Sequence, residues 1–362
     1  MMLPPPPATL RLTIDHTALA DNWRALDAMS GAARAGAAVK ANCYGLGVDA
    51  CVPTLRDAGA TDFFVAHWSE VAAVAAHAAP ASIAVLHGPI NRAEAEYAQA
   101  IGARPVINSL AEAARWLAAG GGPCDLMVDT GINRLGLAAA ELGDPIIDRL
   151  EIDTLLSHLA CADEDSAMNE AQLARFFVVR SQVRARRASI ANSAGIALGP
   201  RYAADLTRPG LALYGGVPRA ELAGHIRQVA YPQAAVILTR QLAAGETVGY
   251  NSLWQATRAT PTAIVSLGYA DGFLRCWASG ALAYRGETLP ILGRVSMDMV
   301  VLDVSAAPDL REGDWIDVPY ALPQASDATG LSQYELLTLL GRRFHPGQSG
   351  CAPDAASAKL PA

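Results

Sequence analysis

The sequence has few charged and few aromatic side chains for its length. Charged residues make up 17% and aromatic residues 6% of the 362 residues, and the formal net charge is −7. A chain with this acidic balance has no overall electrostatic attraction for nucleic acid or for an anionic membrane surface. We therefore expect neither kind of partner.

The patterns of zinc sites, disulfide frameworks and exported proteins are also missing. None of the six cysteines lies in a CxxC pair or at a zinc-like spacing to histidines, so we expect no metal site and reduced thiols. The N-terminal MMLPPPPATLRL lacks the basic and apolar regions of a signal peptide. The longest apolar stretch, Val71–Leu86, contains His77 and Pro80 and is too short for a bilayer span. The expected compartment is the cytoplasm.

What the chain does contain is a repeated unit between Gly36 and about Gly215. Each unit has a short apolar strand, a polar or glycine turn and an alanine-rich amphipathic segment, which indicates βαβ units and a parallel sheet. Eight such units fit a (β/α)8 TIM barrel. A doubly wound open sheet is the alternative, but the GxGxxG phosphate turn that it would need after the first strand is absent. The expected strands are Ala37–Lys40, Asp62–Ala66, Ile83–His87, Pro105–Asn108, Leu126–Asp129, Thr154–His158, Ala188–Asn192 and Leu206–Leu213.

After about residue 230 the pattern changes to alternating strands with frequent glycine turns, which indicates a second, mostly antiparallel β domain. A late helix, Tyr334–Leu340, follows Ser332 as its expected N-cap, with Glu335 as the capping-box partner. The predicted organisation is a barrel domain at 10–230, a β-rich domain at 231–347, and flexible termini at 1–9 and 348–362.

Polar side chains gather at the C-terminal ends of the expected barrel strands, where the loops of a barrel converge and carry its chemistry. They are Lys40, His87, Asn108, Asp129, His158, Asn192 and Arg208. Lys40 stands out because an ammonium that follows a buried strand is costly to desolvate, and desolvation lowers its pKa and makes it a nucleophile or Schiff-base former. The position alone equally allows a rim lysine that reaches water.

The stretch around Lys40, VKANCYGLG, resembles the cofactor-lysine motif of the alanine racemase family. Cys43 and Leu46 stand where Ala and His are more usual, and neither is the Schiff-base group. The resemblance covers about residues 10 to 345. Seven more family motifs follow in the family's order, namely Asp129–Gly136, Ser157–Leu159, Asn192–Gly195, Arg208–Gly215, Val248–Asn251, Gly268–Gly272 and Gly293–Asp298.

The resemblance implies an enzyme that uses pyridoxal phosphate (PLP) to interconvert L-alanine and D-alanine and so supplies D-alanine for peptidoglycan. Racemisation needs a proton removed from one face of Cα and delivered to the other, most simply by two groups. By resemblance these are Lys40, which carries the cofactor, and Tyr250. The family is a homodimer with shared active sites, in which the tyrosine matching Tyr250 and the segment matching Met297 come from the neighbouring subunit.

The remaining site residues take their expected roles from the same resemblance. Arg208 would contact the pyridine nitrogen of PLP, with His158 as its partner. Arg134 would bind the phenolic oxygen of the cofactor and the substrate carboxylate, a role that suits a planar fork of donors. Tyr269 would narrow the entrance beside Met297 and favour small substrates. The residues expected to hold the phosphate or its surroundings are Tyr44, Asn192, Ser193, Gly210 and Leu211.

One departure from the family pattern affects the substrate site. Met127 stands where many members have a lysine, often carbamylated, that orients the arginine matching Arg134. A methionine cannot be carbamylated, so Arg134 must be held by another group, an anion or a water molecule. A smaller departure is that no tyrosine follows Tyr334 to reach the phosphate.

Three alternative functions remain open at this stage. The chain could be a racemase of another small amino acid, such as serine, or of a broader range. A barrel PLP decarboxylase would carry a catalytic cysteine in its second domain and lack the Tyr250 and Gly268–Gly272 pattern. A non-catalytic PLP-binding protein would lack the second domain altogether.

Overall fold

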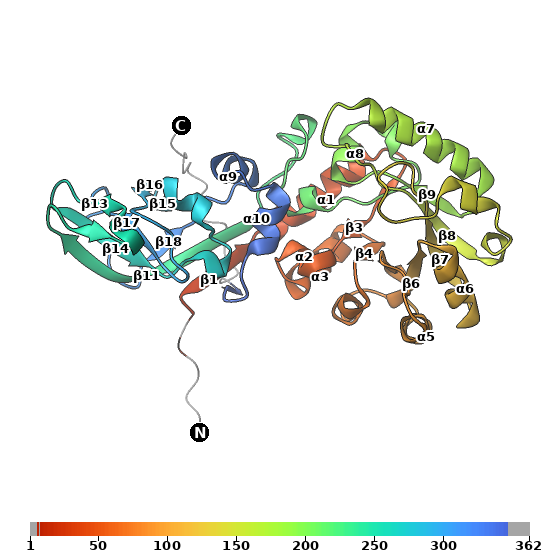
Figure 1. Cartoon of the computed structure of the whole chain (residues 1–362), viewed down its shortest axis with the longest axis horizontal. Helices are drawn as coiled ribbons and strands as arrows, with labels where there is room; N and C mark the ends of the chain where they lie inside the picture. The colour runs from red at the N-terminus through yellow and green to blue at the C-terminus, as the bar shows by residue number, and fades with distance from the viewer. Residues whose placement is uncertain (1–5, 7, 347–362) are drawn as a thin grey trace, which may run out of the picture. The chain divides into compact units, whose positions relative to one another are not determined.

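The chain forms two compact units in the computed structural model, which describes residue 6 and residues 8–346 (Figure 1). One unit is continuous and runs from His16 to Arg227. The other combines the described residues up to Asp15 with those from Gln228 onward. The chain therefore leaves the second unit after a single strand and returns to it some two hundred residues later.

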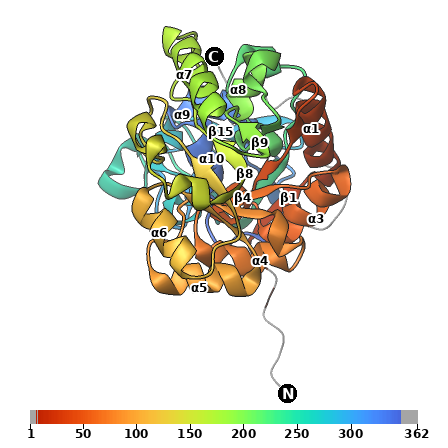
Figure 2. The same cartoon turned by 90° about the vertical axis from the view of Figure 1, so that its right-hand side faces the viewer.

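The unit from His16 to Arg227 is a barrel of short parallel strands, as the sequence predicts. Its helices lie outside the strands, which Figure 2 shows in the end-on view. The strands are β2 (Arg34–Ala35), β3 (Ala37–Ala38), β4 (Phe63–Val65), β5 (Ile83–Val85), β6 (Arg104–Ile107), β7 (Pro123–Met127), β8 (Glu151–Leu156), β9 (Arg187–Ser189) and β10 (Leu206–Thr207). The helices are α1 (His16–Met29), α2 (Lys40–Tyr44), α3 (Val48–Ala58), α4 (Val71–Ala75), α5 (Arg92–Ile101), α6 (Leu110–Ala118), α7 (Ala167–Gln182) and α8 (Ser193–Ala197).

Backbone hydrogen bonds close the strands into a ring. Strands β3 to β9 form one parallel sheet in sequence order, and β10 pairs with β2, which directly precedes β3. The amide of Gly36, between β2 and β3, donates to the carbonyl of Thr207 at 2.9 Å. On the other side, the amide of Arg208 donates to the carbonyl of Ala191 at 2.8 Å. The interrupted β2–β3 strand thus counts as one of eight, and the predicted (β/α)8 barrel is confirmed.

The last barrel strand is shorter than the sequence predicts. The apolar run Leu206–Leu213 was expected to be one strand, but β10 ends at Thr207 and Leu211–Tyr214 form a 3-10 helix. Pro209 has no amide to donate to a strand ladder, which explains the early end. Arg208 therefore lies where the chain turns from strand to helix.

Polar side chains cap the N-termini of outer helices of the barrel. The side chain of Asn91 accepts a hydrogen bond from the amide of Glu94 at 2.9 Å at the start of α5. Ser109 does the same for Glu112 at 3.2 Å at the start of α6. Each cap satisfies an amide that has no partner within the helix, and so fixes where the helix begins.

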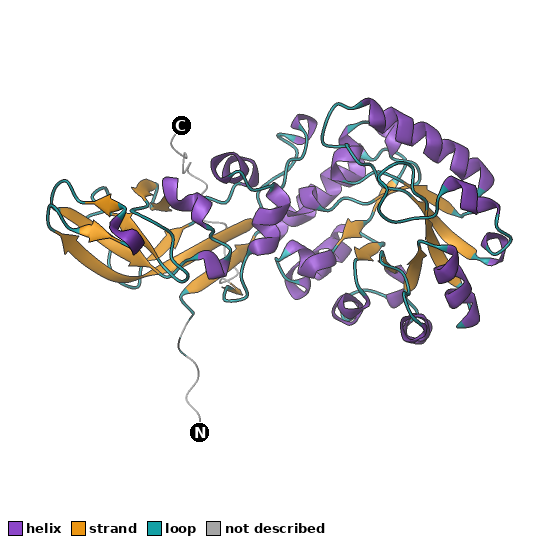
Figure 3. Ribbon diagram, in the orientation of Figure 1, coloured by secondary structure: helices purple, strands orange, loops and turns teal. Residues whose placement is uncertain are grey.

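The second unit is built on a mostly antiparallel sheet, as predicted (Figure 3). Its longest strand, β11, spans 13 residues and pairs antiparallel with three others, so it is the spine of the sheet. The strands are β1 (Leu10–Ile14), β11 (Ala230–Leu242), β12 (Thr247–Val248), β13 (Trp254–Gln255), β14 (Thr260–Val265), β15 (Ala281–Tyr284), β16 (Glu287–Pro290), β17 (Val300–Asp303), β18 (Trp315–Asp317) and β19 (His345–Pro346).

Strand β1 corrects the predicted domain boundary. We expected residues 10–230 to form the barrel domain, but Leu10–Ile14 pair along their whole length with β11, with Leu10 opposite Ala234. The pairing partner is more than two hundred residues away in the sequence, so no local pattern could reveal it. The parallel pairing of β1 with β19 also lies in this unit.

Two helices complete the second unit, α9 (Leu322–Thr329) and α10 (Gln333–Leu339). Ser332 caps α10 and exchanges hydrogen bonds with Glu335, as the capping-box pattern predicts. Most of the two expected flexible termini, 1–9 and 348–362, lies outside the described residues; Thr9 is described and accepts a backbone hydrogen bond from Ala235 at 2.8 Å. Among the described residues, no helix is long and apolar enough to cross a bilayer.

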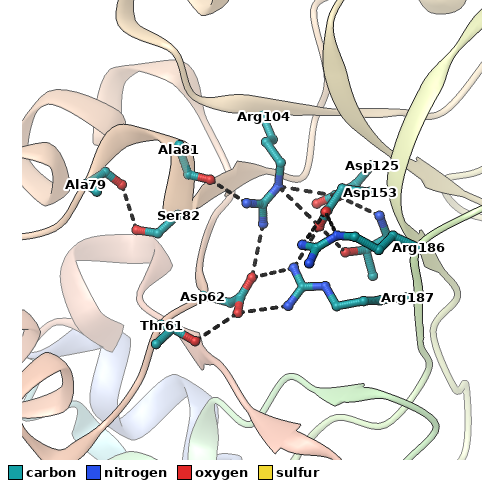
Figure 4. A network of polar contacts seen from close by, with 11 residues as sticks. Thr61, Asp62, Ala79, Ala81, Ser82, Arg104, Asp125, Asp153, Arg186 and Arg187 are labelled. Atoms are coloured by element: carbon teal, nitrogen blue, oxygen red, sulfur yellow. Dashed lines mark hydrogen bonds and ion pairs between the residues drawn. The ribbon is translucent and has the colours of Figure 1, made fainter.

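A buried network of charges fills the end of the barrel at which the strands begin (Figure 4). Arg187 at the start of β9 donates two hydrogen bonds to Asp62, at 2.6 and 3.0 Å, and one to Asp153, at 2.7 Å. Arg104 at the start of β6 contacts Asp62 at 3.2 Å and Asp125 at 3.4 Å. The network therefore links β4 with β6, β7, β8 and β9.

The charges of this network hold one another in place. Burial alone would raise the pKa of Asp62, but the hydrogen bonds and charge of Arg187, with the charge of Arg104, outweigh it and leave the pKa below its usual value. Asp125 is fully buried, and burial raises its pKa. Because desolvation offsets much of the attraction in a buried ion pair, the loss of one partner destabilises more than the intact pair stabilises.

We predict that Asp62→Asn lowers the free energy of unfolding by about 3–5 kcal/mol, because it leaves Arg187 and Arg104 buried without their shared carboxylate. Urea denaturation followed by circular dichroism measures the change. The matched control is Asp57→Asn, which removes an exposed pair with Arg56 and should cost less than about 1 kcal/mol. Equal effects of the two substitutions would contradict a structural role for the network.

Candidate active site

Lys40 begins a strained turn at the C-terminal end of β3. The next four residues, Ala41 to Tyr44, all have φ between 52° and 56°, in the left-handed region. This conformation costs an L-residue roughly 1–2 kcal/mol, so the surrounding structure must impose it. The side chain of Asn42 accepts from the amide of Val48 at 3.0 Å, and the carboxylate of Glu70 accepts from the amide of Ala41. The strain lies directly beside the predicted catalytic lysine.

The amine of Lys40 lies in a cationic environment. Burial lowers its pKa, the charges of Arg134 and Arg208 lower it further, and Glu70 alone among the named groups raises it. A lowered pKa increases the share of neutral amine near pH 7, which is the nucleophilic form and the form that accepts a proton. The direction of this pKa shift is the one expected for a desolvated lysine, and the catalytic role of Lys40 stays a prediction.

Arg208 is buried just beyond β10 and held at both ends of its guanidinium. It donates to the hydroxyl of Ser189 and to the carbonyl of Ser157, the latter at 2.6 Å. Burial lowers the pKa of Arg208 to about 10, and the charge of Asp125 acts in the opposite direction. The guanidinium therefore stays protonated at neutral pH, fixed in direction by β8 and β9.

His158 follows β8 at the mouth of the barrel, where the positive charge of Arg208 acts on its imidazole. Burial lowers the pKa of His158 to about 3, with further contributions from Arg208, Arg134 and Lys40 in that order. The imidazole is thus neutral near pH 7 and can accept a hydrogen bond at one ring nitrogen. Burial also lowers the pKa of a second histidine, His87. The centroid of its ring lies 4.2 Å from that of His67.

The residues predicted to hold a phosphate come together between α8 and the 3-10 helix Leu211–Tyr214. The hydroxyl of Ser193 accepts hydrogen bonds from the amides of Gly210 at 2.9 Å and Ala212 at 3.2 Å. Because these two hydrogen bonds use both lone pairs of the Ser193 hydroxyl, the hydroxyl can only donate its proton to a further group. An anionic oxygen would accept it. The Asn192 side chain instead caps α8, accepting from the amide of Gly195 at 2.8 Å.

Tyr44 closes this cradle from the strained turn. A Cβ atom at residue 210 would overlap the hydroxyl of Tyr44 and would lie 3.3 Å from the Cβ of Ala38. Gly210 is therefore required by the close approach of the turn that carries Lys40. The Tyr44 ring also packs on that of Tyr214, with 5.0 Å between centroids.

Arg134 lies on an exposed loop after β7 whose backbone is firmly held. The carboxylate of Asp129 accepts from the amides of Gly131 at 2.7 Å and Ile132 at 3.0 Å. Met127 is buried, and its Cγ would lie 2.9 Å from a Cβ at Gly136, where φ is 113°. Met127 thus packs against the loop at Gly136, and its thioether has no donor or charge with which to hold the guanidinium of Arg134.

The other predicted residues belong to the second unit. Tyr250 lies in a 3-10 turn, Tyr250–Ser252, and is 68% exposed. Met297 is 52% exposed, and its carbonyl accepts from the amide of Ala270 at 3.0 Å. The structure thus brings the segments of Tyr269 and Met297 together within this unit, and their roles toward a substrate stay predictions.

One residue that supports these segments was not among the residues predicted from the sequence. Arg343 donates to both oxygens of Asp271, at 2.6 and 2.9 Å, and to Asp298 at 2.8 Å, so it ties the Tyr269 and Met297 segments to the end of the unit. In the barrel unit, Glu70 was also not among the predicted residues, and it holds the turn after Lys40. Its bond to Ala41 depends on the left-handed turn, which no sequence pattern announces. Among the described residues, no group of three or more His, Cys, Asp or Glu side chains is placed to hold a metal ion.

We predict that His158→Gln makes the protein less sensitive to acid. Because the folded-state pKa of His158 is about 3 and the unfolded value about 6.5, only the unfolded chain takes up this proton between these pH values. The stability of the wild type should therefore fall with pH in this window by up to about 1.4 kcal/mol per pH unit more than that of the variant. Urea denaturation at pH 7, 6 and 5 measures the difference. The exposed His225, changed to Gln, is the control; identical pH dependence in all three proteins would refute the assignment.

Comparison with known proteins adds to this geometry. The alanine racemase N-terminal domain matches residues 14–218, and the alanine racemase C-terminal domain matches residues 229–346. The biosynthetic alanine racemase of Agrobacterium fabrum is 41% identical over 93% of each chain. The catabolic alanine racemase of the same organism is 40% identical over 98% of this chain and 96% of its own.

Solved structures give the same answer. The crystal structure of alanine racemase from Bartonella henselae, with covalently bound pyridoxal phosphate, superposes with a TM-score of 0.86 at 35% identity, over 94% of this chain and 99% of its own. The biosynthetic alanine racemase from Pseudomonas aeruginosa gives a TM-score of 0.83 at 33% identity, over 94% and 99%. Both domains, their order and their structure agree, and the chain therefore belongs to the alanine racemase family, whose members are PLP-dependent isomerases.

Proposed function

We propose that this protein interconverts L-alanine and D-alanine, with Lys40 and Tyr250 exchanging protons on opposite faces of the substrate Cα. The observation that carries the proposal is the state of Lys40. Its amine is half-buried on a strained turn, and burial with the charges of Arg134 and Arg208 lowers its pKa. Such an amine can carry a cofactor aldehyde and, once released, can accept and return a proton near neutral pH.

The residues of the barrel mouth fit PLP. A phosphate suits the remaining hydroxyl proton of Ser193, and Tyr44 with Gly210 forms a wall that leaves no room for a side chain at residue 210. Leu211 follows Gly210 at the start of the 3-10 helix, so its amide belongs to the same cradle. When bound, PLP supplies an electron-withdrawing ring that makes the Cα proton of the attached amino acid acidic.

Arg208 would orient the cofactor ring, and Arg134 would bind the substrate. Arg208 offers only donors and stays charged, so it would keep a ring nitrogen unprotonated, and His158 is neutral beside it. A weaker pull from the ring favours return of the proton to Cα over other reactions. Arg134, exposed on its rigid loop, presents a fork of donors that suits a substrate carboxylate. Asn192 would contribute by fixing α8 rather than by direct contact.

We further propose a homodimer in which each site takes Tyr250 from the partner subunit. The unit that carries Tyr250 has several exposed large apolar side chains, which a partner subunit would cover. Besides Tyr250 and Met297 they include Leu253 at 60% and Met299 at 42% exposure. With Tyr269 beside Met297, the same segments would narrow the entrance and favour alanine over larger amino acids.

The physiological role that we propose is the supply of D-alanine for peptidoglycan, in the cytoplasm. The five cysteines among the described residues are free thiols, which suits a reducing compartment. Growth of a D-alanine-requiring bacterial strain that expresses this protein would support the role. If the purified protein racemised alanine but did not restore growth, the proposed reaction would stand and the proposed physiological role would fail.

Interconversion of L- and D-alanine by the purified protein, measured with and without added PLP, tests the proposed reaction. We expect activity that requires PLP and is lower with L-serine and other larger amino acids. Borohydride treatment followed by peptide mass spectrometry should find a pyridoxyl group on Lys40 and on no other lysine. A protein that prefers a larger amino acid would end the alanine assignment, and an unlabelled Lys40 would end the proposal as a whole.

The two-base assignment predicts a selective effect of Tyr250→Phe. We expect kcat from L-alanine to fall by about 10²- to 10⁴-fold, the usual contribution of a positioned acid–base group, while the absorbance of bound PLP stays unchanged. Tyr334→Phe, at another exposed tyrosine of the same unit, is the control and should keep its activity. Equal turnover of wild type and Tyr250→Phe in both directions would refute the role.

Mixing this variant with Lys40→Ala tests whether sites are shared. If each site combines Lys40 of one subunit with the tyrosine of the other, a hybrid dimer contains one intact site, and activity should appear from two inactive proteins after subunit exchange. Sites built within single subunits would give no recovery. Each variant is also assayed alone, because activity in an unmixed variant would indicate contamination rather than shared sites.

A further inference from the structure

The carboxylate of Glu70 joins two segments of the barrel mouth. One oxygen, Oε2, accepts from the amides of Ala66 at 2.7 Å and His67 at 3.0 Å, just beyond β4. The other, Oε1, accepts from the amide of Ala41, the residue that follows Lys40. Glu70 is half-buried, and all three bonds go to a charged acceptor, which makes them stronger than ordinary amide hydrogen bonds.

The first pair of bonds is an ordinary helix cap, but the third is not. Later turns of the barrel use the same cap: Glu94 accepts from the amide of Ile90 at 2.9 Å, and Glu112 accepts from that of Asn108 at 2.8 Å. In each case the carboxylate binds an amide of its own loop. The hydrogen bond from Ala41 to Glu70 joins neighbouring strand ends instead, so capping explains Oε2 and leaves Oε1 to another role.

The partner amide lies where the backbone is most strained. Ala41 opens the run of four left-handed residues that ends at Tyr44. A hydrogen bond to a charged group contributes about 1.5–3 kcal/mol, comparable to the cost of one such residue. Glu70 therefore helps to hold the turn that directs Lys40 into the mouth and brings Tyr44 against Gly210.

Glu70 is also the counter-charge of Lys40. The groups that act on this amine come from several elements: Arg134 from the loop after β7, Arg208 from beyond β10, and Glu70 from beyond β4. The imidazoles of His87 and His158 also sense the charge of Lys40. Of these groups only the carboxylate of Glu70 favours the protonated amine, so its removal leaves Lys40 among cations and neutral rings.

We propose that Glu70 is a positioning residue for the racemisation proposed above: through the amide of Ala41 it holds the left-handed turn that presents Lys40, and it supplies the negative charge against which Lys40 exchanges its proton. The role goes beyond helix capping and does not require contact between Glu70 and substrate.

Hydrogen–deuterium exchange of the full-length holoenzyme tests the first part, independently of activity. In Glu70→Gln the amides of residues 41–47 should exchange about 10- to 100-fold faster, the factor that corresponds to losing a hydrogen bond to a charged group. Glu94→Gln removes the charge of the equivalent cap and should leave this segment unchanged. Unchanged exchange in Glu70→Gln, or equally fast exchange in both variants, would overturn the proposal.

The pH profile of kcat with D-alanine tests the second part, because it reports groups in the substrate complex, where the amine of Lys40 is free. Without the charge of Glu70 the pKa of Lys40 falls, so the acidic limb should move to lower pH in Glu70→Gln and stay in place in Glu94→Gln. An unmoved limb overturns the counter-charge role. If the wild type racemised no amino acid, the proposed function would fail while the exchange result would still decide the role of Glu70 in the turn.

Discussion

Positive charge that is removed from water at the mouth of the barrel is the constraint on which the site depends. Lys40 and Arg208 are both desolvated, and both have pKa values below their usual range. The fold tolerates these cations because fixed groups meet them: the Ser157 carbonyl and the Ser189 hydroxyl for the arginine, and Glu70 for the lysine. The same desolvation that costs stability lowers the pKa of the Lys40 amine.

The opposite end of the barrel holds a second group of buried charges, in which arginines are paired with carboxylates. There the strands begin with carboxylates that are held by Arg104 and Arg187, and this network fastens five strands to one another. Asp125 belongs to that network, yet its charge also reaches Arg208. The two ends of the barrel thus share an electrostatic link through Asp125.

The sequence was informative where geometry follows from topology. Parallel strands of a barrel end at one face, so Lys40, His158 and Arg208 could be placed together from strand ends alone. In the structure these residues follow β3, β8 and β10. Prediction failed where long-range pairing or local strain decides. Leu10–Ile14 pairs with a strand more than two hundred residues away in the sequence, and the strand expected at Leu206–Leu213 ends at Thr207, before Pro209. The bond of Glu70 requires four left-handed residues. Residues such as Tyr250 could be recognised only from family motifs.

The insertion of the barrel between β1 and β11 has a consequence for folding during synthesis. A ribosome releases β1 first, but the strand that pairs with it along its whole length is made only after the entire barrel. The barrel is continuous and can fold while the chain grows, whereas β1 must wait as an unpaired edge, the kind of element that invites association with other chains. The strand is only five residues long, and this shortness limits the exposed edge until the sheet closes.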